Sequence, residues 1–313
     1  MENKEKNFVS AVVYIHNAEE QIRSFLEMVL RVLEKNFEHS EIICVNDHSD
    51  DSSAEIVREV SKKAATSSVT ILNMSSFHGL EMAMDAGVDL SIGDFVFEFD
   101  STLQDFSEDE IMRIYRRSLE GFDIVNALPD KKVRFSSKVF YSVFNRFAPG
   151  TYKLTTERFR VMSRRVINRI NSMSRTVPYR KVAYANSGLK SDSIVYQVCG
   201  GVSAEKTNKK ERADRKGLAA DSLILFTNLG YRISLGMTFF MMFIAAFIIA
   251  YAVIIYLTAH PVPGWTTIML FLSVSFLGIF AVATVIIKYL QLLVDLVFKR
   301  KFYSFESIEK LTK

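Results

Sequence analysis

Two groups of acidic side chains follow short apolar runs in the first third of the chain. Asp47, Asp50 and Asp51 come directly after one run, and Asp100 and Asp105 follow a later one. Carboxylate oxygens are the ligands that hard divalent ions prefer in proteins. Two such groups together favour a site for a metal ion or a sugar nucleotide. Either group alone could equally be a solvated loop with helix-capping aspartates.

These acidic groups lie in a stretch where strand-like and helical patterns alternate. Four apolar, β-branched runs predict strands: 8–16, 41–46, 69–72 and 95–99. Three runs with helical periodicity predict helices: 18–35, 54–65 and 80–90. The alternation predicts a parallel sheet with helices on both faces, in which ligands bind beyond the carboxyl ends of the strands. No P-loop pattern and no GxGxxG after the first strand is present, so those two nucleotide-binding classes lose their main support.

Composition divides the chain near residue 230. Hydrophobic residues make up 49% of the 313 residues and are concentrated in 233–297. The net charge of +4 suits an anionic membrane leaflet and does not indicate a nucleic-acid partner. The two cysteines, Cys44 and Cys199, make neither a zinc site nor a disulfide framework, and Cys44 is expected in the core. The charged N-terminus lacks a signal-peptide pattern, which favours a cytoplasmic setting for the soluble part.

Two uncharged runs, 234–259 and 266–287, are each long enough to cross a bilayer as a helix. Prolines and Trp265 lie between them, so a helical hairpin is expected. Basic residues flank only the outer ends, which predicts a multi-pass protein of the cytoplasmic (inner) membrane with both termini in the cytoplasm. The preceding segment 216–232 fits an amphipathic helix in the membrane interface or a plain core helix.

Four segments carry a known family pattern in order along the chain. They are VNDHSDD at 45–51, FHGLEMAMDAG at 77–87, GDFVFEFDSTLQD at 93–105 and ERFRVMSRR at 157–165. These segments resemble family-2 glycosyltransferases of the A fold, in the branch of dolichol-phosphate mannose synthase and the bacterial polyprenyl-phosphate glycosyltransferases. The likeness continues through the interface segment, residues 262–265 and the tail 289–303, and so covers essentially the whole chain.

The resemblance implies an α/β, Rossmann-like nucleotide-sugar-binding domain with interface helices and a C-terminal two-helix transmembrane hairpin. The expected boundaries are 1–205 for the cytoplasmic A-fold domain, 206–232 for a linker and amphipathic interface helix, 233–297 for the two transmembrane helices and 298–313 for a cytoplasmic tail.

The implied activity is that of an inverting hexosyltransferase. It would move a sugar from a nucleotide-sugar donor to a polyprenyl phosphate such as undecaprenyl phosphate, for cell-envelope glycans such as lipopolysaccharide or O-antigen. Mg²⁺ or Mn²⁺ would bridge the donor diphosphate and stabilise it as leaving group. The acceptor phosphate is already anionic and needs little help from a general base. The resemblance also implies self-association and no nucleic-acid partner.

The matching positions imply specific roles for five polar side chains. Asp47 would contact the donor base, and Asp100 the ribose and diphosphate, with Gln104 as a further donor-binding residue. Asp100 and Asp105 would hold the metal ion. Together with Glu157 they are the expected catalytic carboxylates.

Four arginines are expected to bind phosphate, because a guanidinium matches phosphate geometry with two parallel hydrogen bonds. They are Arg134, Arg158, Arg160 and Arg164. For Arg164 and its neighbour Arg165, a cationic face resting on anionic lipid is an equal alternative.

The sequence departs from the family pattern at three positions. Thr102 replaces the second aspartate of the DxD pattern, Arg158 replaces the acidic residue of GDFR, and His48 replaces the glycine of DGS. A hydroxyl is a poor ligand for a hard dication. Either Arg158 takes over part of the metal's charge, or the protein is a catalytically degenerate relative that serves as a non-enzymatic binding or scaffold subunit.

Overall fold

A computed structural model describes residues 4–130, 157–173, 180–199 and 305–312, together with isolated helical positions at 142 and between 236 and 293. The chain divides into two compact units. One comprises Met1–Asn145, Gly150–Ala219 and Lys301–Lys313, and the other Arg146–Pro149 and Ala220–Arg300. Among the described residues, no helix is both long and apolar enough to cross a membrane. Segment 206–232 and most of the expected spans 234–259 and 266–287 lie outside the described residues.

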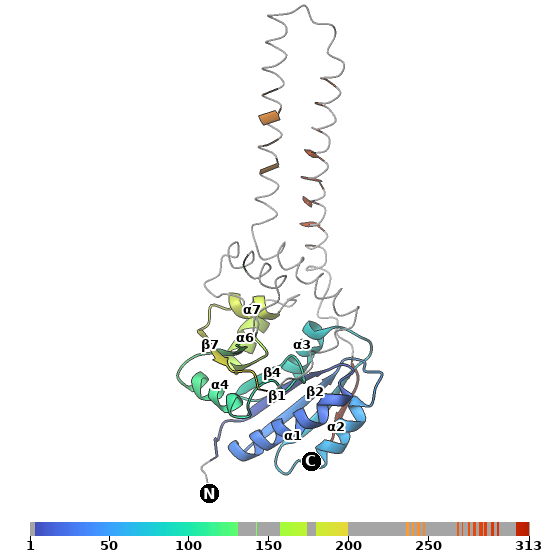
Figure 1. Ribbon diagram of the computed structural model, residues 1–313, viewed down its shortest axis with the longest axis vertical. Coiled ribbons are helices and arrows are strands. Elements are labelled where there is room, and N and C mark those ends of the chain that lie inside the picture. Colours follow the sequence, from blue (N-terminus) through green and yellow to red (C-terminus); the bar gives the residue numbers. More distant parts are fainter. Residues whose placement is uncertain are drawn as a thin grey trace, which may run out of the picture. The chain divides into compact units, whose positions relative to one another are not determined.

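The first unit is built on a mixed sheet of eight strands (Figure 1). Their bounds are β1 Val9–Ile15, β2 Ser40–Asn46, β3 Ser68–Met74, β4 Phe95–Phe99, β5 Ile124–Pro129, β6 Phe159–Ser163, β7 Ser191–Tyr196 and β8 Phe305–Lys310. The spatial order is β7-β5-β6-β4-β1-β2-β3-β8. The first four strands pair in parallel, as the sequence predicts. Strand β6 runs antiparallel to both its neighbours and β8 antiparallel to β3, so the sheet is mixed.

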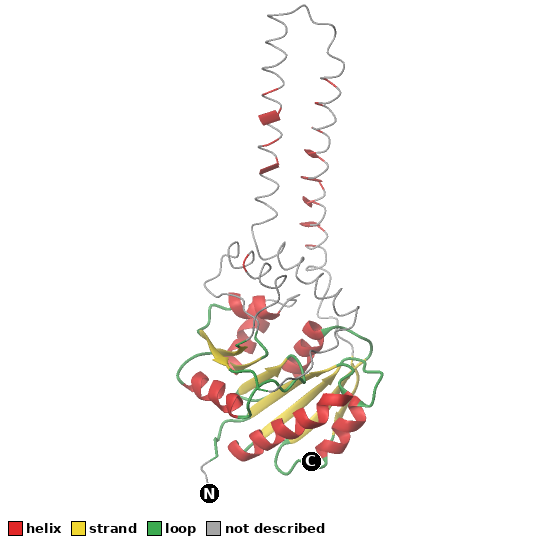
Figure 2. Ribbon diagram, in the orientation of Figure 1, coloured by secondary structure: helices red, strands yellow, loops and turns green. Residues whose placement is uncertain are grey.

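Helices cover both faces of this sheet (Figure 2). Their bounds are α1 Glu19–Asn36, α2 Ser53–Ser61, α3 Leu80–Leu90, α4 Asp109–Leu119, α6 Arg164–Met173 and α7 Arg180–Asn186. Alternate residues of β1 enter different cores, because successive strand side chains point to opposite faces. Ala11 and Val13 pack with α1, α2 and α4, and Val12 packs with α3 and α6.

Helix α3 lies very close to the sheet. A Cβ atom added at Gly87 would lie 2.5 Å from side-chain atoms of both Val12 and Val45. Because both of those side chains are fully buried in β1 and β2, neither has room to move. Glycine at this position therefore sets the position of α3, and with it the loop that leads to β4.

The strand order creates a topological switch point between β1 and β4. The chain runs from β1 outward through β2 and β3, then crosses back to place β4 on the other side of β1. Helices α1 and α3, which follow β1 and β3, lie on opposite faces. Ligands of such sheets bind in the crevice beyond the strand ends at this point. Asp100 directly follows β4, and Asp47 directly follows β2, so the two acidic groups flank the end of β1.

The last strand, β8, joins the sheet from more than 230 residues away. It extends the edge at β3, where Asn73 Nδ2 donates to Ser307 Oγ at 2.9 Å, 234 residues apart in sequence. The sequence places 298–313 in a separate tail, whereas 305–310 form an integral strand of the first unit. The pattern FESIEK is short and polar, and its partner is distant, so a single sequence gives little signal for it.

Candidate active site

The carboxylate of Asp47 is fully buried and closely surrounded by donors. Its oxygens accept the backbone N–H groups of His78 and Gly79, each at 2.8 Å, and the hydroxyl of Tyr14 at 3.0 Å. This aspartate therefore ties the end of β2 to the loop that precedes α3. The expected donor-base residue lies at the carboxyl edge of the sheet, and its carboxylate also fixes the backbone there.

The next residue, His48, adopts a left-handed backbone with φ of 53°. This is the position where the related family pattern has glycine. A side chain in this conformation costs roughly 1 kcal/mol, because Cβ approaches the following carbonyl oxygen. The turn after β2 thus keeps its shape at the expense of local strain.

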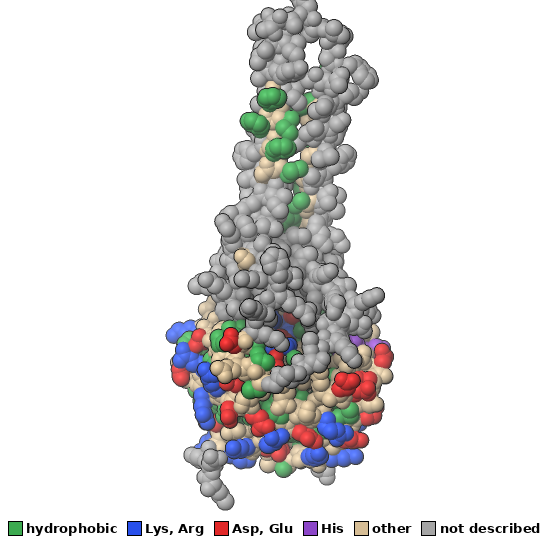
Figure 3. All heavy atoms as spheres, viewed as in Figure 1, with side chains coloured by type: hydrophobic (Ala, Val, Ile, Leu, Met, Phe, Trp, Pro, Cys, Tyr) green, Lys and Arg blue, Asp and Glu red, His purple; other side chains and the backbone are tan. Residues whose placement is uncertain are grey.

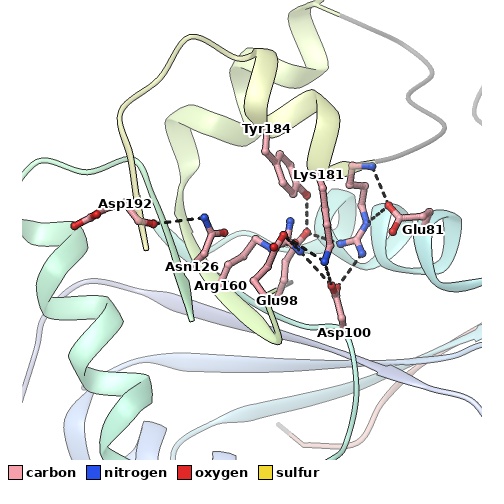
Figure 4. A network of polar contacts seen from close by, with 10 residues as sticks. Glu81, Glu98, Asp100, Asn126, Arg160, Lys181, Tyr184 and Asp192 are labelled. Atoms are coloured by element: carbon pink, nitrogen blue, oxygen red, sulfur yellow. Dashed lines mark hydrogen bonds and ion pairs between the residues drawn. The ribbon is translucent and has the colours of Figure 1, made fainter. Parts of the chain in front are cut away.

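Asp100 is held by three cationic side chains at the switch point (Figure 4). Its Oδ2 lies 3.1 Å from Nη2 of Arg160 in β6, and its Oδ1 lies 3.0 Å from Nη2 of Arg180 in α7. The ammonium of Lys181 lies 3.7 Å from Oδ2. The carboxylate is only 10% exposed, so these cations replace most of the water around it.

Glu98 lies two residues earlier in β4 and is fully buried. Its Oε1 accepts Nη1 of Arg180 at 2.8 Å and the hydroxyl of Tyr184 at 2.6 Å. Its Oε2 lies 3.2 Å from Nε of Arg160. A buried carboxylate is stable only when it is paired and hydrogen-bonded, and Glu98 is paired with both arginines and hydrogen-bonded through Oε1. Its Oε2 and Nε of Arg160 are close enough for an ion pair but form no hydrogen bond with described groups.

Two more carboxylates complete this group of side chains. Glu81, in the first turn of α3, accepts the backbone N–H of Arg180 at 2.8 Å and its Nε at 3.2 Å. Glu157, just before β6, lies 3.4 Å from Nη2 of Arg160 and 3.3 Å from Nζ of Lys181. The resulting ion cluster consists of Glu81, Glu98, Asp100, Glu157, Arg160, Arg180 and Lys181, with Tyr184 bonded to it. It joins α3, β4, β6 and α7.

The cluster strongly shifts the ionisation of its members. Burial opposes a charge on Asp100, but the positive charges of Arg160, Arg180 and Lys181 outweigh it and hold the pKa of that carboxyl well below its ordinary value. Burial together with the charge of Glu98 raises the pKa of the Tyr184 hydroxyl well above its usual range. Asp100 is therefore an anion and Tyr184 a neutral hydrogen-bond donor throughout the physiological pH range.

Asp105 forms a second, separate pair. It is buried, and its Oδ2 accepts Nε of Arg158 at 3.1 Å while its Oδ1 accepts the hydroxyl of Tyr196 at 3.0 Å. Burial beside Asp105 raises the pKa of Tyr196. Thr102 is also buried, with its hydroxyl 3.5 Å from Oε1 of Gln21. Arg158 thus faces a carboxylate of its own chain.

The structure brings together only some of the residues singled out in the sequence. Asp100, Glu157 and Arg160 meet in the ion cluster. Gln104 is half-buried in the loop after β4. Arg164 instead donates from Nε and Nη2 to the carbonyl oxygen of Gly93, at 2.8 and 2.6 Å. Arg134 lies outside the described residues.

Sequence reasoning missed several members of the cluster, namely Glu81, Glu98, Arg180, Lys181 and Tyr184. One signal for them is present in β4, whose sequence is FVFEF. A glutamate on the otherwise apolar face of a buried strand requires a buried cation nearby. Arg180 and Lys181 have no comparable local signal, because only the packing of α7 brings them to β4.

The side chains of this site do not fit a divalent metal ion. Both expected ligands, Asp100 and Asp105, already face cationic groups at 3.0–3.1 Å. The hydroxyl of Thr102 stands where the related pattern has a second carboxylate. Over the described part of the chain, no three His, Cys, Asp or Glu side chains are arranged to hold a metal ion. A dication at Asp100 would lie beside three positively charged side chains, which would repel it.

Fold and site together define a Rossmann-like α/β protein with a charged site at its topological switch point. The sequence model of glycosyl transferase family 2 matches residues 10–170, just over half of the chain. The chain therefore belongs to glycosyl transferase family 2, and the sequence-based expectation of a family-2 glycosyltransferase is confirmed.

Curated relatives are similar over part of their length. The chain is 29% identical over 194 residues to an uncharacterized glycosyltransferase of Synechocystis, a match that covers 60% of each protein. It is 28% identical over 128 residues to the undecaprenyl-phosphate 4-deoxy-4-formamido-L-arabinose transferase of Aeromonas hydrophila, covering 41% of this chain and 39% of that enzyme. The chain thus matches less than two thirds of these relatives.

Among solved structures, the chain is similar to a mannosyltransferase from Pyrobaculum calidifontis in complex with GDP-Man and Mn²⁺. That similarity has a TM-score of 0.48 and 14% identity, and covers 70% of this chain and 63% of the other.

Proposed function

We propose that this protein is a membrane-anchored glycosyltransferase that moves a sugar, with inversion, from a nucleotide-sugar donor to a polyprenyl phosphate such as undecaprenyl phosphate. Its product would serve the modification of cell-envelope glycans. The observation that carries the proposal is Asp100, held as an anion by buried cations at the switch point of a family-2 chain. That is where a donor nucleotide would bind in a sheet of this topology.

In this mechanism an oxygen of the acceptor phosphate attacks the anomeric carbon of the donor sugar. The new C–O bond forms as the bond to the nucleoside diphosphate breaks, and the diphosphate leaves with the electron pair. The acceptor oxygen is anionic near neutral pH, so no proton has to be removed. Asp100 would orient the ribose, and the edge at Asp47 would receive the base. Preorganised charges at the leaving group would lower the barrier.

The acceptor class is supported by relatives. Several curated proteins similar to part of this chain are named undecaprenyl-phosphate 4-deoxy-4-formamido-L-arabinose transferases, at 28–32% identity. Their names specify a lipid phosphate as acceptor. We therefore propose a polyprenyl phosphate as the acceptor of this chain and assign no particular sugar.

Membrane anchoring is supported by the second unit. The uncharged runs 234–259 and 266–287 have the length and composition of spanning helices. Phe240, Phe243 and Phe247 are helical and 56–71% exposed, and Figure 3 shows hydrophobic side chains at the surface of this unit. The spacing of three and four residues puts these phenylalanines on one side of a helix. Such a face suits a lipid environment.

The return of the chain to the sheet supports a hairpin. Residues 191–196 form β7 and residues 305–310 form β8 of the same sheet. Any membrane crossing between them must therefore be followed by a crossing back. The number of membrane spans between β7 and β8 is then even. This agrees with the two spans expected from the sequence and with both termini on one side of the membrane.

The test is transfer of radiolabelled sugar from a panel of UDP- and GDP-sugars to undecaprenyl phosphate by the purified full chain in detergent. We expect a labelled lipid product with at least one donor, and none when undecaprenol without phosphate is the acceptor. Nucleotide binding without transfer from any donor would contradict the proposal. That outcome would favour a non-catalytic binding or scaffold subunit. The observation that supports this alternative is Thr102, which stands where the family pattern has a carboxylate.

A further inference from the structure

Lys181 is the most accessible cation of the ion cluster. Its side chain is 10% exposed, compared with 1% for Arg160 and 4% for Arg180. Its Nζ lies 3.3 Å from Glu157 and 3.7 Å from Asp100. The two arginines are enclosed and each contact three carboxylates, so they are fixed in place.

The donor diphosphate needs a cationic partner beside Asp100, and Arg160, Arg180 and Lys181 are the cations that the described structure places there. A divalent ion would have to displace guanidinium groups from both Asp100 and Asp105. It would also lack the carboxylate that Thr102 replaces. A dication bound by Asp100 would also be repelled by the charges of Arg160, Arg180 and Lys181. The cationic side chains therefore oppose the binding of a metal ion at Asp100.

We propose that Lys181 supplies the positive charge that binds the donor diphosphate beside Asp100, so that donor binding does not require a divalent ion. This rests on the proposed function, because it takes a nucleoside diphosphate as the ligand of the same site. Arg160 and Arg180 act as positioning residues that hold Asp100. Lys181 exchanges a carboxylate contact for a phosphate contact on binding.

This exchange is chemically reasonable for the residues concerned. A lysine ammonium is a compact charge on a flexible stem, and it can reorient without losing the fork geometry that an arginine requires. When Lys181 turns to a phosphate, Asp100 keeps both of its guanidinium partners and Glu157 keeps Arg160. Neither of these two carboxylates is then without a cation.

The test measures binding of UDP and GDP to the purified full chain in detergent by titration calorimetry, once in EDTA and once in Mn²⁺. For whichever nucleotide binds, we expect Kd in EDTA to lie within about threefold of Kd in Mn²⁺. Lys181→Gln should weaken binding about tenfold in both buffers, the loss of one charge-assisted contact. Lys181→Arg should restore most of the affinity. Arg113→Gln, which removes an exposed cation of α4, is the matched control and should bind as wild type.

Wild-type binding that disappears in EDTA would overturn the inference, as would Lys181→Gln binding with unchanged affinity. Sugar transfer that occurs only with Mn²⁺, together with metal-dependent binding, would overturn it and leave the proposed function intact. EDTA-resistant binding without transfer would support the inference and contradict the proposed function. Absence of binding by both nucleotides in both buffers would contradict both. The wild-type comparison needs no substitution, so a variant that fails to fold does not weaken the test.

Discussion

Arg58 and Glu309 form a bidentate ion pair, although they lie 251 residues apart in the sequence. Nε and Nη2 of Arg58 in α2 donate to the two oxygens of Glu309 in β8, at 2.9 and 2.8 Å. This pair fastens the strand that follows the second unit to the edge of the sheet. The two side chains are 38% and 35% exposed, so water screens the pair and its contribution is about 1 kcal/mol.

Glu309→Gln should therefore loosen β8 without unfolding the sheet. We expect backbone amides of 305–310 to exchange hydrogen about fivefold faster, because a local opening that is about 1 kcal/mol easier is several times more populated. Amides of β1 should be unchanged. Hydrogen exchange followed by mass spectrometry measures both segments, and Glu55→Gln on α2 is the control. Unchanged exchange in β8 would mean that the pair does not hold the strand.

Tyr184→Phe should destabilise the protein by about 1–3 kcal/mol. The substitution removes a hydroxyl that donates to the fully buried Glu98 at 2.6 Å, and it leaves that carboxylate short of a partner. Tyr115→Phe is a matched comparison, because its side chain is also buried but its hydroxyl accepts from the neutral amide of Asn7, a partly exposed residue. It should cost no more than about 1 kcal/mol. The midpoint of thermal unfolding measures both; equal effects would contradict the account of the ion cluster.

His48→Gly should leave stability nearly unchanged, whereas His48→Val should lower it by about 1–2 kcal/mol. Glycine relieves the left-handed strain at φ 53° but gains entropy in the unfolded chain, and these effects nearly cancel. A β-branched side chain makes the strain worse. His39→Val, at an exposed position outside the left-handed region, should be neutral. A destabilising His48→Gly would show that the imidazole itself is needed in the turn. Thermal unfolding again provides the measurement.

Much of the central sheet could be predicted from sequence, because its strands are continuous apolar runs. The structure confirms strands at β1 to β4 and a helix over Leu80–Leu90. Helix α2 ends at Ser61, four residues before the sequence suggests. Asp100 is predictable for the same reason, because it directly follows a buried strand and ligands of such sheets bind beyond the carboxyl ends of the strands.

The environment of Asp100 could not be predicted in the same way. Arg180 and Lys181 reach it only through packing between segments about 80 residues apart. Ion pairs of that kind leave no periodicity or spacing in the sequence. The contact of Arg158 with Asp105 is likewise not readable from the sequence, because the pairing of β6 with β4 and β5 decides which side chains of 157–160 meet which carboxylates.

The two cysteines should differ sharply in reactivity. Cys44 is buried in β2, and burial raises the pKa of its thiol to about 12, whereas Cys199 is exposed. The thiolate is the reactive form, so at pH 8 the folded chain should react with Ellman's reagent at Cys199 alone. Unfolding should expose the thiol of Cys44, so that both cysteines then react. Because the pKa of Cys44 is raised by folding, the unfolded thiol ionises first, and this residue lowers stability as pH rises from about 9 towards 12. Two fast-reacting thiols in the folded chain would contradict the buried position of Cys44, and Cys199→Ser assigns the signal.

The most direct test of the central claim compares sugar transfer to undecaprenyl phosphate by the wild type, Asp100→Asn and Asp109→Asn. Asp100 lies in the cluster at the switch point, and Asp109 is an exposed carboxylate in the first turn of α4. We predict at least a hundredfold loss of transfer for Asp100→Asn, which is about 2.7 kcal/mol of lost transition-state stabilisation, with unchanged transfer for Asp109→Asn. Transfer by Asp100→Asn at the wild-type rate would contradict the account.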